Sequence, residues 1–182
     1  MGEIWVTSDT HFCHQKEFLW APRGFSSQYE MNEAIVENWN KIVRSGDTVY
    51  LLGDIMLNDN ITGTKLLHSL QGDIHLVCGN HDTPERIEIY RNSWNIVTVS
   101  LAERLKYNGY NFFLCHYPVL CNNYDDGKDL KHKTISLCGH THTKDRFADM
   151  DKGVIYHCEL DAHDNKPVNI EEVIADLKSK IG

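Results

Sequence analysis

The segment Ile135–His142, with the sequence ISLCGHTH, joins a short apolar run to two histidines that are one residue apart. Apolar residues that end in a glycine are typical of a buried strand followed by a turn. A His-x-His pair after such a strand is either a solvated polar turn or a pair of nitrogen ligands presented to a metal ion. The pair by itself leaves both interpretations open, and the ends of the other predicted strands bear on the choice.

Strand-like segments recur along the chain. They are short, rich in apolar and β-branched residues, and bounded by Gly, Asp or Asn. The pattern predicts strands at residues 3–8, 48–53, 73–79, 95–100, 110–115, 134–139 and 153–160. Because many of these runs are almost continuously apolar, they indicate a layered α/β fold whose strands are covered on both faces.

Helical patterns lie between these strands. Ser27 and Glu30 form a capping box in front of apolar residues at helical spacing. A shorter helix is expected around residues 66–70, and another should begin at Thr83, which is followed by proline. Asn169 is the expected cap of a C-terminal helix with an apolar stripe on one face.

Composition bounds the class of protein. A chain of 182 residues predicts a single domain, residues 1–182. We expect no membrane span, because no run of about 18 apolar residues occurs. We also expect no signal peptide, and therefore a cytoplasmic protein whose cysteines are reduced. The net charge of −8 makes long nucleic acid an unfavourable partner. A small phosphate ester can still bind if metal ions supply positive charge locally.

Polar residues follow five of the predicted strands. In chain order they are Asp9 and His11, Asp54, Asn80 with His81 and Asp82, His116, and His140 with His142. Because loops at the carboxyl ends of strands gather at one edge of an α/β sheet, these residues can converge although they are far apart in the chain. In the D-x-H and H-x-H pairs, alternation along an extended chain should place both side chains on the same side.

The residue types favour metal ligation. Carboxylate, amide and imidazole groups without thiolate suit Mn²⁺, Fe or Zn²⁺. The candidate ligands are Asp9, His11, Asp54, Asn80, His116, His140 and His142. They are too many for one catalytic ion that keeps an open position, and they suit two ions about 3.5–4 Å apart that share one carboxylate.

The motifs D-x-H, G-D, G-N-H-D, H and G-H-x-H are intact, occur in this order between residues 9 and 142, and resemble those of the calcineurin-like metallophosphoesterase superfamily. The segment SDTHFCHQKEF (8–18) is similar to the small bacterial and phage-type members. The resemblance implies a four-layer α/β/β/α sandwich of two mixed sheets flanked by helices. It also implies two divalent metal ions, with Mn²⁺ preferred and Fe, Zn²⁺ or Ni²⁺ as alternatives.

The resemblance further implies how the polar residues divide their roles. One ion would be held by Asp9, His11 and His142, the other by Asn80, His116 and His140, with Asp54 bridging the two. A hydroxide shared by both ions would attack phosphorus in line, and His81 would protonate the leaving oxygen. Asp82 would orient His81 and favour its charged form, or would instead cap the helix that follows.

The predicted function is therefore a dinuclear-metal-dependent phosphoesterase. Phosphodiesters, including nucleotide-derived ones, are the favoured substrates, because a chain of this length leaves little room for a cap over the site. The alternatives are a phosphomonoesterase or protein phosphatase, a nuclease, and a non-catalytic interaction module, which the intact motifs disfavour. The polar loop 121–133 is either a solvated connection or a rim of the site that could close over substrate.

A few further residues could carry function. His14 follows the first metal motif and could contact the phosphate, and Arg23 could bind an anionic substrate or remain a solvated charge. His157 and His163 could suggest another metal site with Asp161, although the family pattern has none there. The physiological substrate and the oligomeric state do not follow from the sequence.

Overall fold

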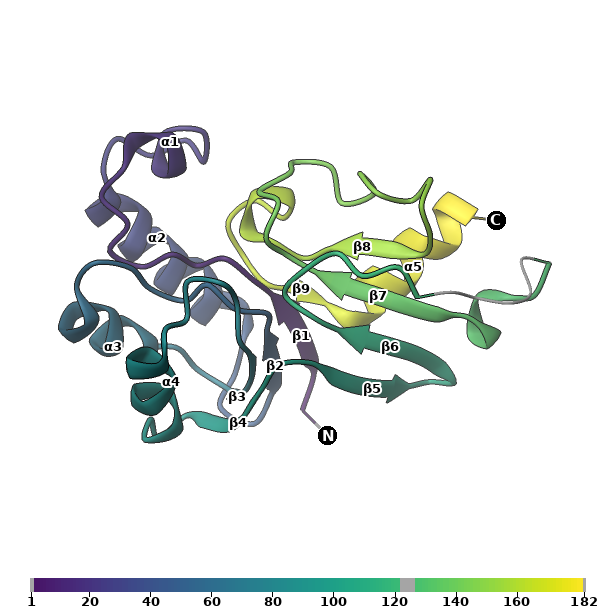
Figure 1. Ribbon diagram of the computed structural model, residues 1–182, viewed down its shortest axis with the longest axis horizontal. Helices are drawn as coiled ribbons and strands as arrows, with labels where there is room; N and C mark the ends of the chain where they lie inside the picture. The colour runs from purple at the N-terminus through teal and green to yellow at the C-terminus, as the bar shows by residue number, and fades with distance from the viewer. Residues whose placement is uncertain (1, 122–126, 182) are drawn as a thin grey trace.

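Two mixed sheets form the centre of the computed structural model, which describes residues 2–121 and 127–181 (Figure 1). The first sheet contains β1 (Ile4–Thr7), β2 (Thr48–Leu51), β3 (Asp73–Val77), β4 (Ile96–Ser100) and β9 (Val168–Asn169), and the second contains β5 (Glu103–Tyr107), β6 (Tyr110–Leu114), β7 (Thr134–Cys138) and β8 (Ile155–His157). The strand orders are β4-β3-β2-β1-β9 and β5-β6-β7-β8. Only β9 in the first sheet and β5 in the second run antiparallel to their neighbours.

Helices flank the two sheets. They are α1 (Glu17–Trp20), α2 (Gln28–Ile42), α3 (Asn60–His68), α4 (Pro84–Arg91) and α5 (Ile170–Ile181), with 3₁₀ turns at Leu130–His132 and Leu160–Ala162. α2, α3 and α4 pack on the first sheet (Figure 1), and α5 packs against the apolar face of the second sheet and against β1 and β9 of the first. This arrangement confirms the predicted α/β/β/α sandwich. No helix among the described residues is long and apolar enough to cross a membrane.

Neighbouring residues of the central strands point into different parts of the core. Trp5 and Leu51 belong to the apolar cluster shared with α2, α3 and α4, whereas Val6 and Leu52 belong to the cluster between the sheets and α5. Side chains alternate along a strand, so a strand between two layers must be apolar at every position. This is the physical reason for the continuous apolar runs in the sequence.

The predicted helix caps are present. Ser27 Oγ accepts a hydrogen bond from the Glu30 N–H at 3.2 Å, and Asn169 Oδ1 accepts one from the Glu171 N–H at 2.9 Å. Thr83 caps α4, with Pro84 in its first turn. Each cap satisfies a backbone donor that has no partner inside the helix.

The sequence prediction missed three short elements: β5, β9 and α1. β5 has the sequence ERLKY, in which charged residues alternate with apolar ones, and it lies at the edge of its sheet. The predicted strand 153–160 is also too long, because the chain leaves the sheet after His157. Residues 122–126 of the predicted loop 121–133 lie outside the described residues.

Backbone hydrogen bonds connect the loops that follow the strands. The Asp9 N–H donates to the Gly53 carbonyl at 3.0 Å, and the His11 N–H donates to the Asp54 carbonyl at 3.0 Å. In the second sheet the Gly139 N–H donates to the His116 carbonyl at 2.9 Å. These bonds extend the parallel strand pairing into the loops, so that the polar residues of both sheets gather at one edge.

Candidate dinuclear metal site

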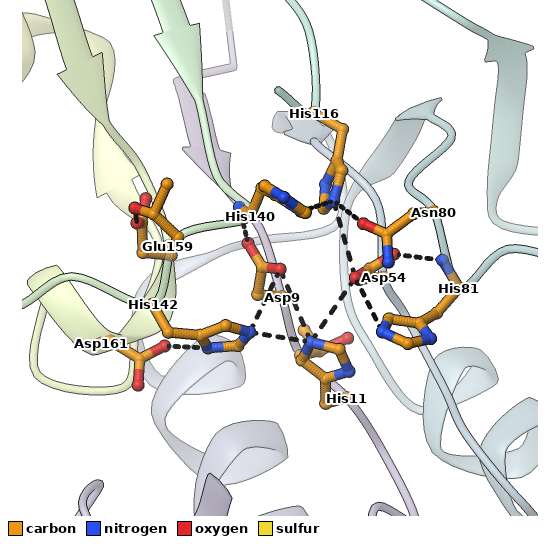
Figure 2. Close-up of polar contacts among 12 residues, drawn as sticks. Asp9, His11, Asp54, Asn80, His81, His116, His140, His142, Glu159 and Asp161 are labelled. Atoms are coloured by element: carbon orange, nitrogen blue, oxygen red, sulfur yellow. Dashed lines mark hydrogen bonds and ion pairs between the residues drawn. The ribbon is translucent and has the colours of Figure 1, made fainter. Parts of the chain in front are cut away.

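All seven predicted metal ligands meet at the edge where these loops come together (Figure 2). The loop after β1 supplies Asp9 and His11, those after β2 and β3 supply Asp54 and Asn80, and those after β6 and β7 supply His116, His140 and His142. Both sheets therefore contribute to one site, which local sequence patterns could suggest but not establish.

One group of ligand atoms surrounds Asp9. His11 Nε2 and His142 Nε2 are 3.1 Å apart, and Asp9 Oδ1 lies 3.6 Å from the first and 3.7 Å from the second. Asp9 Oδ2 accepts a hydrogen bond from the His140 N–H at 2.9 Å, which leaves Oδ1 facing the imidazoles. This buried oxygen has no hydrogen-bond donor among the described residues. A buried carboxylate oxygen in such surroundings fits a cation.

A second group of ligand atoms surrounds His116, which is fully buried. Its Nδ1 hydrogen-bonds to the Leu52 carbonyl oxygen at 2.8 Å and must be the donor, so Nε2 keeps its lone pair for a metal. Asn80 Oδ1 lies 2.9 Å from His116 Nε2, and His140 Nδ1 lies 3.2 Å from it. Oxygen and nitrogen ligands thus converge here as well.

Asp54 lies between the two groups. Its Oδ1 accepts a hydrogen bond from the His81 N–H at 2.8 Å. Its Oδ2 is 3.7 Å from His11 Nε2 and 3.6 Å from His116 Nε2, one imidazole from each group. Asp9 also borders both groups. Asp54 would be the better bridge between two ions, because its free oxygen faces a nitrogen ligand on either side. The residues present therefore fit two divalent ions.

The backbone at these ligands is unusual. Asp9, His11, Asp54, His140 and His142 all have positive φ angles, between 46° and 75°. Residues other than glycine rarely adopt this conformation, which costs about 1–3 kcal/mol each. The expectation that the D-x-H and H-x-H pairs are extended is therefore wrong. Left-handed turns, fixed by the hydrogen bonds between loops, bring the members of each pair together.

Glycines allow the loops to approach closely. A Cβ atom on Gly79 would collide with the Asp54 carboxylate, and one on Gly139 would collide with Ser8 and Asp9. Gly53 has a φ of 86°, and a side chain there would meet the backbone of Gly79. The glycines that precede the ligands are needed because backbone and carboxylate oxygens occupy the space of a side chain.

His81 lies at the edge of the ligand set. Its Nε2 is 3.9 Å from Asp54 Oδ2, and its side chain is 46% exposed. The imidazole centre is 5.6 Å from that of His11. His81 is therefore next to the ligands but open to solvent, the position that a proton donor to a bound substrate requires.

Asp82 has a different role from either of the predicted ones. Its carboxylate accepts hydrogen bonds from the N–H groups of Gly79, Asp54 and Ile55, at 2.7, 2.9 and 3.3 Å, and from the Tyr90 hydroxyl at 2.9 Å. These bonds occupy both oxygens, and none of the hydrogen bonds found among the described residues joins Asp82 to the His81 ring. The helix cap is Thr83. Asp82 ties together the loops after β2 and β3.

The sequence analysis missed the role of Asp161. Asp161 Oδ2 lies 2.9 Å from His142 Nδ1, so that His142 presents Nε2 to the metal site (Figure 2). Arg23 holds Asp161 with two hydrogen bonds, at 3.0 and 2.7 Å, and also donates to the Asp9 carbonyl at 2.8 Å. Arg23 is thus a buried positioning residue, neither a solvated charge nor a free binder of anionic substrate.

A second carboxylate braces the same loop. Glu159 is fully buried, and its Oε1 accepts hydrogen bonds from the Thr141 hydroxyl at 2.8 Å and the Thr143 N–H at 3.3 Å. It also lies 3.2 Å from His157 Nδ1. His157 and Asp161 therefore face different partners. Among the described residues they do not form the additional metal site that the sequence raised.

Electrostatics in the site follow from these contacts. Burial opposes the charged form of His142, but the hydrogen bond to Asp161 and the charge of Asp9 outweigh it and raise the His142 pKa. Burial would raise the pKa of Asp161, yet His142 and Arg23 lower it to about 2. Burial lowers the pKa of His11 and of His140. Neutral imidazoles are the form that binds metal.

His14 lies beside the ligand set, as expected for a substrate contact. Its ring centre is 5.6 Å from that of His11 and 5.3 Å from that of Phe18. Burial, followed by the nearby histidines, lowers its pKa to about 4. His14 is therefore neutral near pH 7 and offers a hydrogen bond to a substrate oxygen, not a charge.

Two mixed sheets with a set of nitrogen and oxygen ligands for two ions at one edge fit a metal-dependent phosphoesterase. The family model of the calcineurin-like phosphoesterase superfamily domain matches residues 3–171. The chain belongs to this superfamily, as its motifs indicated, and membership supports a hydrolase.

Two relatives match this chain in sequence over different lengths. An uncharacterised protein of Methanocaldococcus jannaschii is 37% identical over 120 residues, 65% of this chain and 60% of that protein. The match therefore spans less than two thirds of that relative's length. The gene 66 protein of Mycobacterium phage D29 is 28% identical and is matched across 98% of both chains.

Solved structures share the fold. A protein of unknown function from Aquifex aeolicus superposes with a TM-score of 0.74 and 22% identity, over 96% of this chain and 99% of the other. An archaeal phosphodiesterase superposes with a TM-score of 0.50 and 17% identity, over 88% of this chain and 86% of the other. At these identities the likeness concerns the fold alone.

Proposed function

We propose that this protein is a dinuclear-metal-dependent phosphodiesterase. The observation that carries the proposal is the position of Asp54, whose free oxygen faces His11 on one side and His116 on the other, beside the exposed His81. Divalent ions bound there, Mn²⁺ by preference, would lower the pKa of water and neutralise charge on phosphate oxygens.

The residues of the chain supply the rest of the chemistry. Asp9, Asp54 and Asn80 hold their oxygens in place because backbone hydrogen bonds fix the loops that carry them. In hydrolysis a water oxygen forms a bond to phosphorus, the bond to the leaving oxygen breaks, and that oxygen takes up a proton. His81 is the group placed to donate this proton, and a proton donor matters most when the leaving group is a poor one.

The charges around the site favour a diester over a monoester. A diester carries one negative charge near pH 7, whereas a monoester carries up to two. Arg23, which could have paired with a second charge, is buried and held by Asp161. The chain has a net charge of −8, so bound ions are the main positive charge offered to substrate.

The proposal is tested with matched nitrophenyl phosphate mono- and diesters, using protein stripped of metal and refilled with Mn²⁺. We expect a higher kcat/KM for the diester and loss of activity in Asp54→Asn, which keeps the size and the left-handed backbone tolerance of the residue. A preference for the monoester would establish a phosphomonoesterase instead. Two bound ions without turnover of either ester would contradict the proposed activity.

A further inference from the structure

We propose that a pocket beside His140 receives the substituent that stays on phosphorus, and that this substituent is a planar aromatic group such as an aryl ring or a nucleobase. The inference rests on the proposed phosphodiesterase activity and adds the substrate class. The pocket has a volume of about 600 Å³, and its walls are Tyr117, Pro118, Leu120, His140, Thr141, Asp149, Lys152 and Ile155.

The pocket adjoins the metal site directly. His140 is a wall of the pocket, and its Nδ1 lies 3.2 Å from His116 Nε2 within the second ligand group. A phosphate held by the ligand groups therefore has the pocket as its neighbour. Pockets of roughly 300–1,000 Å³ are the usual size for an organic ligand, so this one exceeds what a phosphate group alone would fill.

The position of His81 decides which part of the substrate faces the pocket. His81 and His140 lie on different sides of Asp54 (Figure 2). The leaving oxygen must approach His81 to receive its proton, and in-line displacement places the retained substituents away from it. The pocket at His140 consequently faces the retained ester group of a diester, which a monoester lacks.

Tyr117 gives the pocket its preference for a flat ring. Its ring centre is 4.8 Å from that of His140 and 5.1 Å from that of His116, with interplanar angles of 64° and 75°. These edge contacts hold the tyrosine ring, yet the residue is 45% exposed. A held aromatic ring with a free surface is suited to stacking against an aryl ring or a nucleobase.

The remaining walls suit an uncharged group. Pro118, Leu120 and Ile155 are apolar. Lys152 Nζ lies 2.6 Å from Asp149 Oδ1, and Asp149 Oδ2 lies 2.9 Å from His157 Nε2. Because the lysine and the aspartate are paired, the pocket offers hydrogen-bonding groups at its edge without a free charge, which matches a ring with polar edges.

The test uses two diesters with the same nitrophenolate leaving group, one retaining a methyl and the other a phenyl substituent. Wild-type protein refilled with Mn²⁺ should show the higher kcat/KM for the phenyl ester. Tyr117→Ala should lower kcat/KM for the phenyl ester by about tenfold more than for the methyl ester, as expected for one lost stacking contact. Tyr117→Phe should behave as wild type.

Trp94→Ala is the matched control. Trp94 is an aromatic residue with 73% exposure that lies two residues before β4, at the opposite end of that strand from the metal-site loops. Replacing Trp94 should change kcat/KM for neither ester. If Tyr117→Ala lowers kcat/KM for both esters equally, the Tyr117 ring only supports His140 and the pocket inference is wrong. A wild type that does not distinguish the two esters would overturn it as well.

Binding separates this inference from the proposed activity. Calorimetry on Mn²⁺-loaded protein compares phenyl phosphate with methyl phosphate, the corresponding products. Tighter binding of phenyl phosphate that is lost in Tyr117→Ala would support the pocket even if no diester were turned over, in which case only the activity fails. Equal binding of the two products would overturn the pocket even in an active enzyme.

Discussion

The two central carboxylates, Asp9 and Asp54, divide their oxygens in the same way. In each, one oxygen accepts a backbone N–H, from His140 and from His81 respectively, and the other faces imidazole nitrogens. The tied oxygen fixes the rotamer, so the free oxygen is placed before any ion binds. Such preorganisation reduces the cost of ordering the ligands when a metal binds.

The first prediction concerns His81. His81→Gln should retain two bound ions, because His81 lies outside the two ligand groups. It should lower kcat by about 10²–10⁴-fold for a methyl alkoxide leaving group and much less for nitrophenolate, which leaves without protonation. Rates on matched diesters and metal analysis of the same samples check this. An equal loss for both leaving groups would contradict proton donation.

The second prediction concerns Asp161, which orients His142. Asp161→Asn should weaken binding of one of the two ions by about 10–100-fold, because the amide can no longer fix the His142 ring as a carboxylate does. Calorimetric titration of metal-stripped protein with Mn²⁺ should resolve one weakened and one unchanged site. Both sites unchanged would mean that Arg23 and the loop position His142 without Asp161.

A control for this prediction is Asp176→Asn. Asp176 also accepts a hydrogen bond from an arginine, Arg146, at 2.6 Å, but belongs to α5 and not to the metal-site loops. Its substitution should leave both metal affinities at wild-type values.

At the scale of elements, Asp82 links the ends of β2 and β3 to α4. Its partners are backbone N–H groups in the two loops and the hydroxyl of Tyr90, which is buried in α4. Burial, and then the charge of Asp82, raise the pKa of Tyr90, so its hydroxyl remains a donor. The loops that carry Asp54 and Asn80 are thus held at a fixed separation by one carboxylate.

The third prediction compares two variants of this contact. Asp82→Asn should lower the free energy of unfolding by about 3 kcal/mol, because an amide cannot accept all the buried N–H donors. It should also weaken metal binding, since both ligand loops lose their common anchor. Tyr90→Phe removes one bond and should cost about 1.5 kcal/mol with metal binding retained. Urea unfolding and metal titration distinguish the two outcomes; equal costs would contradict the anchoring role.

At the scale of the whole molecule, buried His163 makes stability depend on pH. Its Nε2 donates to the His157 carbonyl at 2.9 Å, and its ring stacks on Tyr156. Burial lowers its pKa to about 4; the charge of Arg146 acts in the same direction, whereas the His157 carbonyl, Asp176 and Asp164 act against it. The unfolded chain should titrate near the ordinary value of about 6.5.

The fourth prediction follows from this difference. Between pH 6.5 and 4 the unfolded state binds a proton that the folded state does not, so the contribution of His163 is full above pH 6.5 and is lost as pH falls toward 4. The slope is at most about 1.4 kcal/mol per pH unit. Urea unfolding of the wild type and of His163→Gln, each with a chelator present, isolates the pH-dependent contribution of His163 to the free energy of unfolding. Glutamine is the suitable replacement because it keeps an N–H donor. Parallel curves for the two proteins would contradict it.

The sequence by itself determined which residues are the candidate ligands. Asp9, Asp54 and His116 could be predicted because each follows an apolar strand and has the chemistry that metals require, and both properties are local. The capping residues Ser27 and Asn169 were predictable for the same reason, since a cap and its partner lie within one turn. The burial of the central strands on both faces was also predictable, because their sequences are apolar at nearly every position. A strand with one solvated face would instead alternate apolar and polar residues.

Tertiary structure alone decided how those ligands are held. Arg23 and Asp161 are 138 residues apart in the chain and meet only because the two sheets face each other. Three of the donors to the Asp82 carboxylate are backbone N–H groups, which have no sequence signature, and so its predicted role was wrong. The left-handed backbone at Asp9 and His140 is likewise imposed by hydrogen bonds between loops. The type of each candidate ligand can be read from its own position in the sequence. The hydrogen-bond partners that hold it are distant in the chain and are brought to it only when the sheets and loops pack together.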